Sequence, residues 1–338
     1  MTPAFLGIDA GGTSTHAVLV LGDGTCVAHA RRSGGNPTSR GRTDALNAIV
    51  EAAQDALGRA SVTLGEPVAV NECVLAMAGE PDKIDTPVLA RAVGLTAGSV
   101  HLASDVEAMY FSSACEPEGS VVVAGTGSVA ARLSSGVLTQ AAGGAGWLLG
   151  DGGSGFWIGR NVVRAVVAQL SGLGPATGMT PSVLEAFGVP GDAGAPARQK
   201  LEALVRSAYA QPPVHLARFA PIAFALADHD DAARHLLERA GEHLAVLVER
   251  FPGDGPLVLG GSVVTRGFLP RPGLSGALAA ALHGRDVRTA ENGGAGAAFL
   301  ALTRSGPGLS VARRAAHRAG HRAAHARITS TLTDRPLP

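Results

Sequence analysis

The chain contains the same local pattern twice: a buried strand runs into a glycine turn and a second apolar strand follows. The first copy spans Phe5–Thr13 and continues into Ala17–Leu21, and the second spans Val121–Ser128 and continues into Val129–Leu133. Glycine turns that present bare backbone N–H groups form concavities that bind anions. Two such turns in one chain therefore predict two lobes that hold a polyphosphate between them.

Length and composition narrow the class of protein. The chain has 338 residues, more than one hydrophobic core usually holds, so two domains are expected. A net charge of zero gives no global field that would attract nucleic acid. There is no apolar run of about 18 residues and no basic N-terminal leader pattern, so neither a membrane helix nor a signal peptide is expected. The cysteines Cys26, Cys73 and Cys115 are scattered and form no CxxC motif, which argues against a disulfide framework or a zinc site. We expect a cytoplasmic enzyme with no nucleic-acid or membrane partner.

The expected elements describe two α/β domains of similar plan, with a boundary near residues 116–119. In the first half we expect a three-stranded meander over 4–31, a loop over 33–38, helices over 43–60, 85–93 and 104–114, and strands over 68–78 and 101–103. In the second half the strand pattern repeats from residue 120, followed by a glycine-rich loop over 143–155, helices over 156–170, 231–251, 274–282 and 296–303, and strands over 256–259 and 286–289.

After Gly306 the sequence becomes rich in Arg and His, and His317, His321 and His325 are spaced four residues apart. This spacing would suit a metal or anion face on a helix. A solvated terminal helix or frayed tail explains the same composition, and we expect the latter.

Two common phosphate-binding motifs do not fit the glycine turns. A P-loop requires a lysine directly after a glycine, and neither Lys83 nor Lys200 is so placed. Gly125–Ala130 matches the looser dinucleotide pattern G-x-G-x-x-A, but that turn must open a helix and be followed by an acidic residue about 20 positions later. Here Ser134–Gly136 interrupts the chain, and no Asp or Glu occurs between Glu118 and Asp151. The second turn therefore predicts a hairpin phosphate site.

Two polar residues of the first copy suit this chemistry. Asp9 stands at the end of a buried strand and could hold Mg²⁺ through water, since Mg²⁺ prefers hard oxygen ligands and keeps several waters. Thr13 could donate to a terminal phosphate. The alternatives are an Asp that stabilises the turn and a Thr that merely suits a strand.

These motifs resemble those of a known superfamily. Asp9–Thr13 and Ala124–Ser128 resemble the two phosphate motifs of the actin, hexokinase and Hsp70 ATPases, and Leu257–Ser262 resembles their adenosine motif. Within that superfamily Gly143–Gly159 resembles a glycine-rich stretch of the N-acetylglucosamine kinase and BadF/BadG/BcrA/BcrD ATPase family, and the resemblance runs from about residue 5 to 303. It implies an α/β fold of two ribonuclease H-like (actin/hexokinase-type) domains with an ATP cleft between them.

The resemblance also implies that the two domains bind different parts of the substrates. Residues 1–118, joined by the helix near 293–304, would form the domain on the sugar and phosphate side. Residues 119–292, with a helical insertion, would form the nucleotide side, and 305–338 would be a basic tail. The residues expected to bind ATP with its Mg²⁺ are Gly11, Gly12, Thr13, Thr126, Gly127, Ser128, Gly260, Gly261 and Ser262, together with Asp9 for the metal.

The central residue of the expected sugar site is Asp105, which lies where a strand meets a helix. Phosphorylation of a hydroxyl needs a proton acceptor at the attacking oxygen, and the resemblance places the catalytic Asp of the family at this position. The sequence alone also allows an N-cap carboxylate, and the two roles are compatible. The residues expected to contact the sugar are Asn36, Gly79, Asp105, Gly146, Trp147, Asp151 and Ser154.

The chain departs from the family pattern at Ala145, where a Trp is usual, and at Gly152, where a Glu is usual. The smaller residue at 145 would reshape the wall of the sugar pocket. We therefore expect an ATP-dependent kinase that phosphorylates the primary (6-) hydroxyl of N-acetylglucosamine or of a relative such as glucosamine. Family analogy also predicts a homodimer.

Two other functions stay open. The first is an ATPase that activates a dehydratase or reductase; such proteins hold an iron–sulfur cluster through cysteines, whereas here the cysteine nearest to the second turn, Cys115, precedes it. The second is a non-catalytic sugar sensor. Sensors of this superfamily carry a helix-turn-helix before the fold, whereas the first strand here begins near Ala4, and an intact Asp105 favours catalysis.

Overall fold

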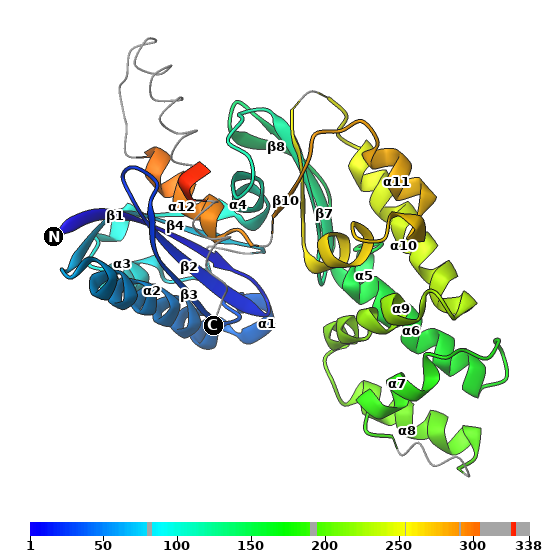
Figure 1. Cartoon of the computed structure of the whole chain (residues 1–338). Helices are drawn as coiled ribbons and strands as arrows, with labels where there is room; N and C mark the ends of the chain where they lie inside the picture. The colour runs from blue at the N-terminus through cyan, green and yellow to red at the C-terminus, as the bar shows by residue number, and fades with distance from the viewer. Residues whose placement is uncertain (80–82, 190–194, 254, 291, 305–325, 329–338) are drawn as a thin grey trace. The chain divides into compact units, whose positions relative to one another are not determined.

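The computed structural model describes residues 1–79, 83–189, 195–253, 255–290, 292–304 and 326–328. Nearly all of the predicted tail 305–338, including His317, His321 and His325, lies outside these residues. The chain forms two compact units (Figure 1). Unit 1 comprises Met1–Gly119, Leu133–Leu138 and Arg288–Pro338, and unit 2 comprises Ser120–Arg132 and Thr139–Val287.

Unit 1 is built on a five-stranded mixed sheet of order β3-β2-β1-β4-β5. The first three strands form the expected antiparallel meander, and β4 and β5 run parallel to β1. The carboxyl ends of β1, β4 and β5 therefore meet at one edge of the sheet. The bounds are β1 (Thr2–Ala10), β2 (Ser14–Leu21), β3 (Cys26–Ser33), β4 (Val68–Met77) and β5 (Val100–Ser104).

Helices cover both faces of this sheet (Figure 1). On one face lies α2 (Arg42–Leu64), whose buried stripe is almost entirely alanine and so allows close packing. On the other face α12 (Gly294–Arg304) packs against β1 and against α4 (Asp105–Phe111). This packing requires Gly7, because a Cβ built there would lie 1.9 Å from the Ala298 nitrogen. Unit 1 also contains the short helices α1 (Pro37–Arg40) and α3 (Thr86–Ala92) and a 3₁₀ turn over Ala97–Ser99.

Unit 2 contains a second five-stranded sheet, of order β10-β9-β6-β7-β8, in which β6 and β9 are parallel. The strands are β6 (Gly119–Ala124), β7 (Ser128–Ser134), β8 (Val137–Gly143), β9 (Leu257–Gly260) and β10 (Val287–Ala290), and the last of these ends beyond the unit boundary. The predicted repeat of the strand–turn–strand pattern is thus confirmed.

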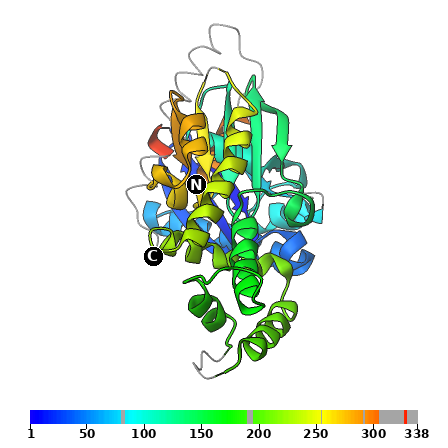
Figure 2. The ribbon, with the colours of Figure 1, turned by 90° about the vertical axis from the view of Figure 1, so that its right-hand side faces the viewer.

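The core of unit 2 lies between this sheet and its helices. The helices α7 and α8 lie at the end of the unit away from the sheet (Figures 1 and 2). Among the described residues no helix is both long and apolar enough to span a bilayer. The α-helices are α5 (Gly146–Leu149), α6 (Gly155–Leu170), α7 (Thr180–Ala186), α8 (Ala197–Tyr209), α9 (Ala220–Leu226), α10 (Asp231–Glu249) and α11 (Gly276–Leu282); Val263–Phe268 is a π-helical turn and Pro213–Phe219 a 3₁₀ segment.

Three local expectations differ from the structure. The predicted loop over 33–38 ends in α1, because Asn36 caps it and Pro37 occupies its first position, both of which favour a helix start. The predicted loop over 143–155 contains the one-turn helix α5. The helix predicted over 104–114 is confined to Asp105–Phe111.

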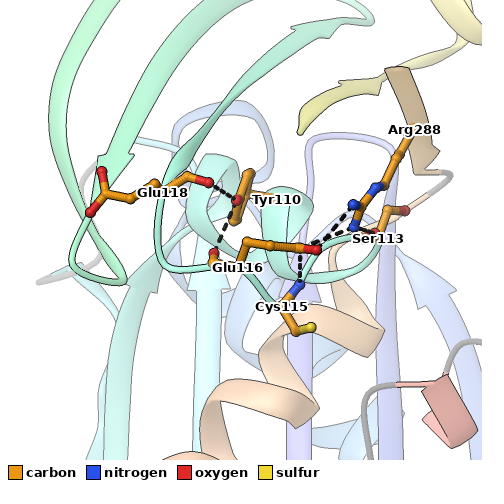
Figure 3. A network of polar contacts seen from close by, with 6 residues as sticks. All are labelled: Tyr110, Ser113, Cys115, Glu116, Glu118 and Arg288. Atoms are coloured by element: carbon orange, nitrogen blue, oxygen red, sulfur yellow. Dashed lines mark hydrogen bonds and ion pairs between the residues drawn. The ribbon is translucent and has the colours of Figure 1, made fainter. Parts of the chain in front are cut away.

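Polar contacts tie together the segments of unit 1 that lead to and from unit 2 (Figure 3). Both guanidinium NH groups of Arg288 lie 3.0 Å from the Glu116 carboxylate. The hydroxyl of the fully buried Tyr110 lies 3.0 Å from the carbonyls of Glu116 and Glu118. Ser113 Oγ donates to the Thr289 carbonyl at 2.6 Å. The outgoing and returning segments are therefore held as one piece of unit 1.

Candidate functional site

Two carboxylates, Asp9 and Asp105, stand at the carboxyl edge of the sheet in unit 1. Asp9 on β1 pairs with Ala76 on β4, and Ala76 pairs with Ala103 on β5, two residues before Asp105. The parallel register thus brings together two acids that are 96 residues apart in the sequence. The two carboxyl groups interact electrostatically, since the charge of Asp105 contributes to the raised pKa of Asp9.

Asp9 anchors the start of α12. Its Oδ2 accepts the Gly293 N–H at 2.7 Å. A Cβ at Gly293 would lie 3.2 Å from the Asp9 carboxyl carbon and 3.1 Å from the Ala108 Cβ, so glycine permits this close approach. Burial raises the pKa of Asp9 to about 7, the Gly293 hydrogen bond opposes this rise, and Asp105 adds to it. The Asp9 carboxyl therefore changes charge near neutral pH.

Asp105 is the first residue of α4, and the cap itself is Ser104. Ser104 Oγ accepts the Val106 N–H at 3.2 Å, so the N-cap role considered for Asp105 belongs to its neighbour. Asp105 Oδ1 accepts the same N–H at 2.9 Å. Burial raises the pKa of Asp105, while its hydrogen bonds with Val106 and Ser104 oppose the rise. The carboxylate is held in place and is easier to protonate than a free one.

A hollow of about 370 Å³ opens beside Asp105 in unit 1. Asn36 reaches its rim, since Asn36 Nδ2 donates to the Ala78 carbonyl at 3.2 Å while its Oδ1 accepts the Thr38 N–H at 2.8 Å. Gly79 has a φ of +85°, which suits glycine at the strand end. The structure thus gathers three predicted sugar residues: Asn36, Gly79 and Asp105. The hollow is lined by Met77, Ala78, Gly79, Leu102, Ala103, Ser104, Asp105 and Glu107.

Glu107 is a residue of this hollow that the sequence analysis missed. It lies in the first turn of α4, two residues after Asp105. Burial raises the pKa of its carboxyl, and the charge of Arg304 opposes the rise. Its place in the same first turn was the only signal that could have found it.

The first glycine turn presents free backbone donors. Gly11 N–H donates to the Ser14 carbonyl at 3.0 Å, and the Gly11 carbonyl accepts the N–H groups of Gly35 and Asn36 at 3.0 and 3.2 Å. Gly12 and Thr13 are exposed, and within the described part of the chain their N–H groups have no protein acceptor. The turn is held by carbonyls and leaves N–H groups for an anion.

The second glycine turn follows the same rule in unit 2. The Gly125 carbonyl accepts the Gly155 N–H at 2.7 Å and the Thr126 carbonyl accepts the Phe156 N–H at 3.1 Å. Both donors belong to the first turn of α6, whose N-terminus carries partial positive charge. The N–H groups of Thr126 and Gly127 have no protein acceptor among the residues described. They are therefore available to a phosphate.

Hydrogen bonds of Ser128 with Asp151 and Gly152 stabilise this second turn. Ser128 N–H donates to Asp151 Oδ1 at 3.2 Å and Ser128 Oγ donates to the Gly152 carbonyl at 2.9 Å. Both Ser128 donors are thus engaged within unit 2. A Cβ at Gly127 would lie 2.9 Å from Asp151 Oδ2, so glycine is needed beside this carboxylate. Asp151 has a left-handed φ of +59°, and burial raises its pKa against the Ser128 hydrogen bond.

The remaining residues of the glycine-rich segment divide into buried and exposed ones. Ser154, predicted to contact the sugar, is 0% exposed in this structure, and its Oγ caps α6 by accepting the Trp157 N–H at 3.1 Å. Gly146 and Trp147 lie in the exposed helix α5, which begins after Ala145. The Trp147 ring packs 5.5 Å from that of Phe156.

The adenosine-like motif packs directly on the second glycine turn. Gly261 has a φ of +85°, and a Cβ there would lie 2.4 Å from the Ala124 carbonyl group, so only glycine fits. Gly260 is the buried last residue of β9. A cavity of about 370 Å³ lies beside these turns, entirely within unit 2. Its lining consists of Gly125, Thr126, Gly155, Ala217, Ala220, Pro221, Phe224, Ser262, Val263, Arg266 and Gly267.

This cavity brings together Thr126 and Ser262, two of the residues predicted to bind ATP. It also includes Pro221, Phe224 and Arg266, which the sequence analysis missed. The first two come from α9 in the helical insertion, and Arg266 comes from the π-helical turn. No local motif marks them, because they reach the cavity only through tertiary packing.

The donor set for a metal is small. The described residues contain no group of three His, Cys, Asp or Glu side chains arranged to hold an ion. Mg²⁺ in nucleotide sites is commonly bound by one or two carboxylates, several waters and the substrate phosphates. Asp9, with one oxygen taken by Gly293 and the first glycine turn beside it, fits that pattern.

The comparisons with known proteins identify the family. A model of the BadF/BadG/BcrA/BcrD ATPase family matches residues 6–295. The chain belongs to this family. A solved structure from Chromobacterium violaceum, described as a candidate N-acetylglucosamine kinase, matches with a TM-score of 0.67 and 23% identity, covering 89% of this chain and 99% of that one. The expected α/β fold of the actin/hexokinase type is therefore confirmed.

Two curated relatives match over part of their length. The N-acetyl-D-glucosamine kinase of Dictyostelium discoideum is 30% identical over 196 residues, which is 54% of this chain and 59% of that protein. The N-acetylmuramic acid/N-acetylglucosamine kinase of Clostridium acetobutylicum is 24% identical over 180 residues, 53% of this chain and 58% of that protein. The match to this BadF-family chain spans less than three fifths of each relative's length.

Proposed function

We propose that this protein is an ATP-dependent kinase that phosphorylates the primary (6-) hydroxyl of N-acetylglucosamine or of a close relative such as glucosamine. The observation that carries the proposal is Asp105, a rigidly held carboxylate of raised pKa that lines a hollow in unit 1. Asp9 and the first glycine turn occupy the same edge of the sheet, and unit 2 contains a second glycine turn beside a cavity. The names of the two curated relatives support an amino sugar as the acceptor.

In the proposed reaction the Asp105 carboxylate accepts the proton of the sugar hydroxyl. The hydroxyl oxygen forms a bond to the γ-phosphorus of ATP, the bond from that phosphorus to the β-phosphate oxygen breaks, and ADP leaves. A proton acceptor is most effective when its pKa approaches the working pH, and burial shifts Asp105 in that direction. The unengaged N–H groups of both glycine turns would stabilise the phosphate charge.

Asp9 would hold Mg²⁺, through water, with the phosphates of ATP. When bound, the ion supplies positive charge that neutralises the transferring phosphoryl group. The protein contributes the position of the carboxylate, which the Gly293 hydrogen bond fixes, and its ionisation, which requires a pH near or above about 7.

Asn36 and Gly79 would contact the sugar in the hollow beside Asp105, and Gly146, Trp147 and Asp151 would contribute from the glycine-rich segment. Ala145 leaves more room than the Trp usual in the family, so a bulkier amino sugar is a reasonable acceptor. One relative is named for N-acetylmuramic acid as well as N-acetylglucosamine. The acceptor screen should therefore include this sugar.

The test is ADP release with N-acetylglucosamine, glucosamine, N-acetylmannosamine, N-acetylmuramic acid and glucose, followed by phosphorus NMR of the product to identify the phosphorylated hydroxyl. We expect one amino sugar to dominate. Asp105→Asn should lower turnover with that sugar at least about a thousandfold while nucleotide binding persists. A flat response across the sugars with a high basal ATPase rate would overturn the proposal.

The activator-type ATPase is not favoured by the cysteines. Cys26 and Cys73 are buried, and burial raises the pKa of the Cys73 thiol to about 12, which opposes the thiolate that a cluster needs. We also propose a cytoplasmic homodimer. None of the three cysteines forms a disulfide, which suits a reducing compartment, and light scattering after gel filtration tests the dimer.

A further inference from the structure

The cavity of unit 2 has an unusual balance of hydrogen-bonding groups away from its glycine turn. Its walls there are apolar and come from Ala217, Ala220, Pro221 and Phe224. Among the residues that line it, Arg266 is the one charged side chain, and no lining side chain carries a carboxylate or an amide. The Arg266 guanidinium donates hydrogen bonds and accepts none, and the other polar side chains of the lining are the hydroxyl groups of Thr126 and Ser262.

Arg266 lies in an irregular part of the backbone beside the cavity. Val263–Phe268 is a π-helical turn, in which the Leu269 N–H donates to the Val264 carbonyl five residues earlier at 3.0 Å. Turns of this kind often mark functional sites. The neighbouring Gly267 lets the Phe224 ring pack in the space of a side chain, because a Cβ at 267 would lie 2.5 Å from that ring.

The Arg266 side chain is also available for an interaction with a ligand. Its side chain is exposed, and among the described residues it makes no hydrogen bond, ion pair or ring contact. Other arginines of unit 2 are engaged: Arg271 donates to the Phe224 carbonyl, and Arg132 donates to the Pro252 carbonyl. A free guanidinium at the wall of a cavity is a group available to a ligand.

Guanidinium chemistry distinguishes the purines. Guanine and hypoxanthine present two adjacent acceptors, O6 and N7, which a guanidinium can engage with two parallel N–H groups. Adenine presents N7 beside an amino group, and that amino group finds no carboxylate or amide acceptor among the lining side chains. Glutamine, with one donor and one acceptor, is the side chain that matches adenine.

We propose that Arg266 sets the base preference of this cavity, so that 6-oxopurine nucleotides bind and serve as phosphoryl donors at least as well as ATP. The inference rests on the proposed function only for the transfer step, in which the γ-phosphoryl group of GTP passes to the sugar and GDP leaves. Binding of the base to unit 2 requires no sugar.

The experiment is titration calorimetry of the full chain with ADP, GDP, IDP and UDP in the presence of Mg²⁺ and without sugar. We expect GDP and IDP to bind within about threefold of ADP or more tightly, and UDP to bind more weakly because it offers a single ring. Arg266→Ala should weaken GDP and IDP about tenfold and ADP by less than about threefold. Arg266→Gln should shift the ratio of affinities toward ADP by about tenfold or more, and Arg198→Ala, an exposed arginine on α8, is the matched control.

Three results would overturn the inference. One is wild-type binding of GDP and IDP more than about threefold weaker than that of ADP. Another is an equal loss for all four nucleotides in Arg266→Ala, together with weaker binding of inorganic tripolyphosphate, which would place Arg266 on the phosphates. The third is an Arg266→Gln variant with unchanged preference and an unchanged melting temperature. Failure of the kinase proposal would look different: no sugar would be phosphorylated with any donor while the order of nucleotide affinities remained.

Discussion

Asp9→Asn should make the protein more stable and less active, and the gain in stability should depend on pH. The Asp9 pKa is raised from 3.8 to about 7, chiefly by burial. A raised pKa means that the folded state binds a proton that the unfolded state has already lost, so stability falls as pH rises from about 4 to about 7. Above that range the full cost of the buried charge is present.

The size of the effect follows from the shift. The shift of about three pKa units lowers the free energy of unfolding by about 4 kcal/mol at pH 8. At pH 5 only the part of the shift that lies below pH 5 contributes, which is about 2 kcal/mol. Asparagine keeps an oxygen that can accept the Gly293 N–H, but its amide group must find a partner of its own. We therefore expect about half of the full effect: a gain of about 2 kcal/mol at pH 8 and about 1 kcal/mol or less at pH 5.

The assay is thermal unfolding of wild type and variant at pH 8 and pH 5, with EDTA and without nucleotide. The gain at pH 8 corresponds to a rise of about 4–8 °C in melting temperature, since about 2–4 °C per kcal/mol is usual for folding units of this size. Glu51→Gln, which removes an exposed charge from α2 in the same unit, is the control and should show no comparable rise.

The activity of Asp9→Asn should fall even as stability rises, because a neutral amide is a poorer partner for Mg²⁺ than a carboxylate. In the wild type the Mg²⁺ concentration needed for half-maximal activity should increase below about pH 7, as Asp9 takes up its proton. The reasoning is refuted if Asp9→Asn is less stable than wild type at pH 8, or if its gain is the same at both pH values.

Three further substitutions test other parts of the structure. Ser154→Ala removes the cap of α6 and should lower the free energy of unfolding by about 1 kcal/mol in chemical denaturation; a selective rise in the KM for sugar at unchanged stability would instead return Ser154 to the sugar site. Gly261→Ala forces a side chain into the Ala124 carbonyl at a φ of +85° and should weaken ADP binding by calorimetry more than about tenfold, and unchanged binding would contradict the close packing of the two turns. Glu116→Gln weakens the pair with Arg288, which is about one third exposed, and should cost about 1 kcal/mol or less at pH 8; an equal effect in about 1 M salt, where the ion pair is screened, would contradict the ionic origin.

The sequence predicted those parts of the site that local patterns encode. Each glycine turn follows a buried strand directly, so the order of residues alone places Gly11–Thr13 and Thr126–Gly127 at strand ends. The proximity of Asp9 and Asp105 needed one further step, the parallel arrangement of β1, β4 and β5, which the order of strands and helices implied. Fold class and the carboxylate edge were therefore predictable together.

The sequence could not predict which polar groups the protein uses internally. Ser128 and Ser154 have the residue type and the position expected of ligand contacts, yet their hydroxyl groups bond to Gly152 and to the Trp157 N–H. Whether a hydroxyl group faces a ligand or a helix end depends on packing between α6 and the second turn. Arg266 and Phe224 were missed for the converse reason, because elements distant in sequence bring them to the cavity.

The two glycine turns share one construction but differ in what supports them. In unit 1 the loop at Gly35 and Asn36 holds the carbonyl of the turn, whereas in unit 2 the first turn of the 16-residue helix α6 holds two carbonyls and adds its own partial positive charge. The cavity that we propose for the nucleotide base lies wholly within unit 2. The two acids of the proposed catalytic site, Asp9 and Asp105, belong to unit 1. A change at Asp105 should therefore lower turnover while leaving the affinity for ADP, measured without sugar, nearly unchanged, whereas a change at Asp9 should also alter the Mg²⁺ dependence, so that the two roles can be separated by mutation.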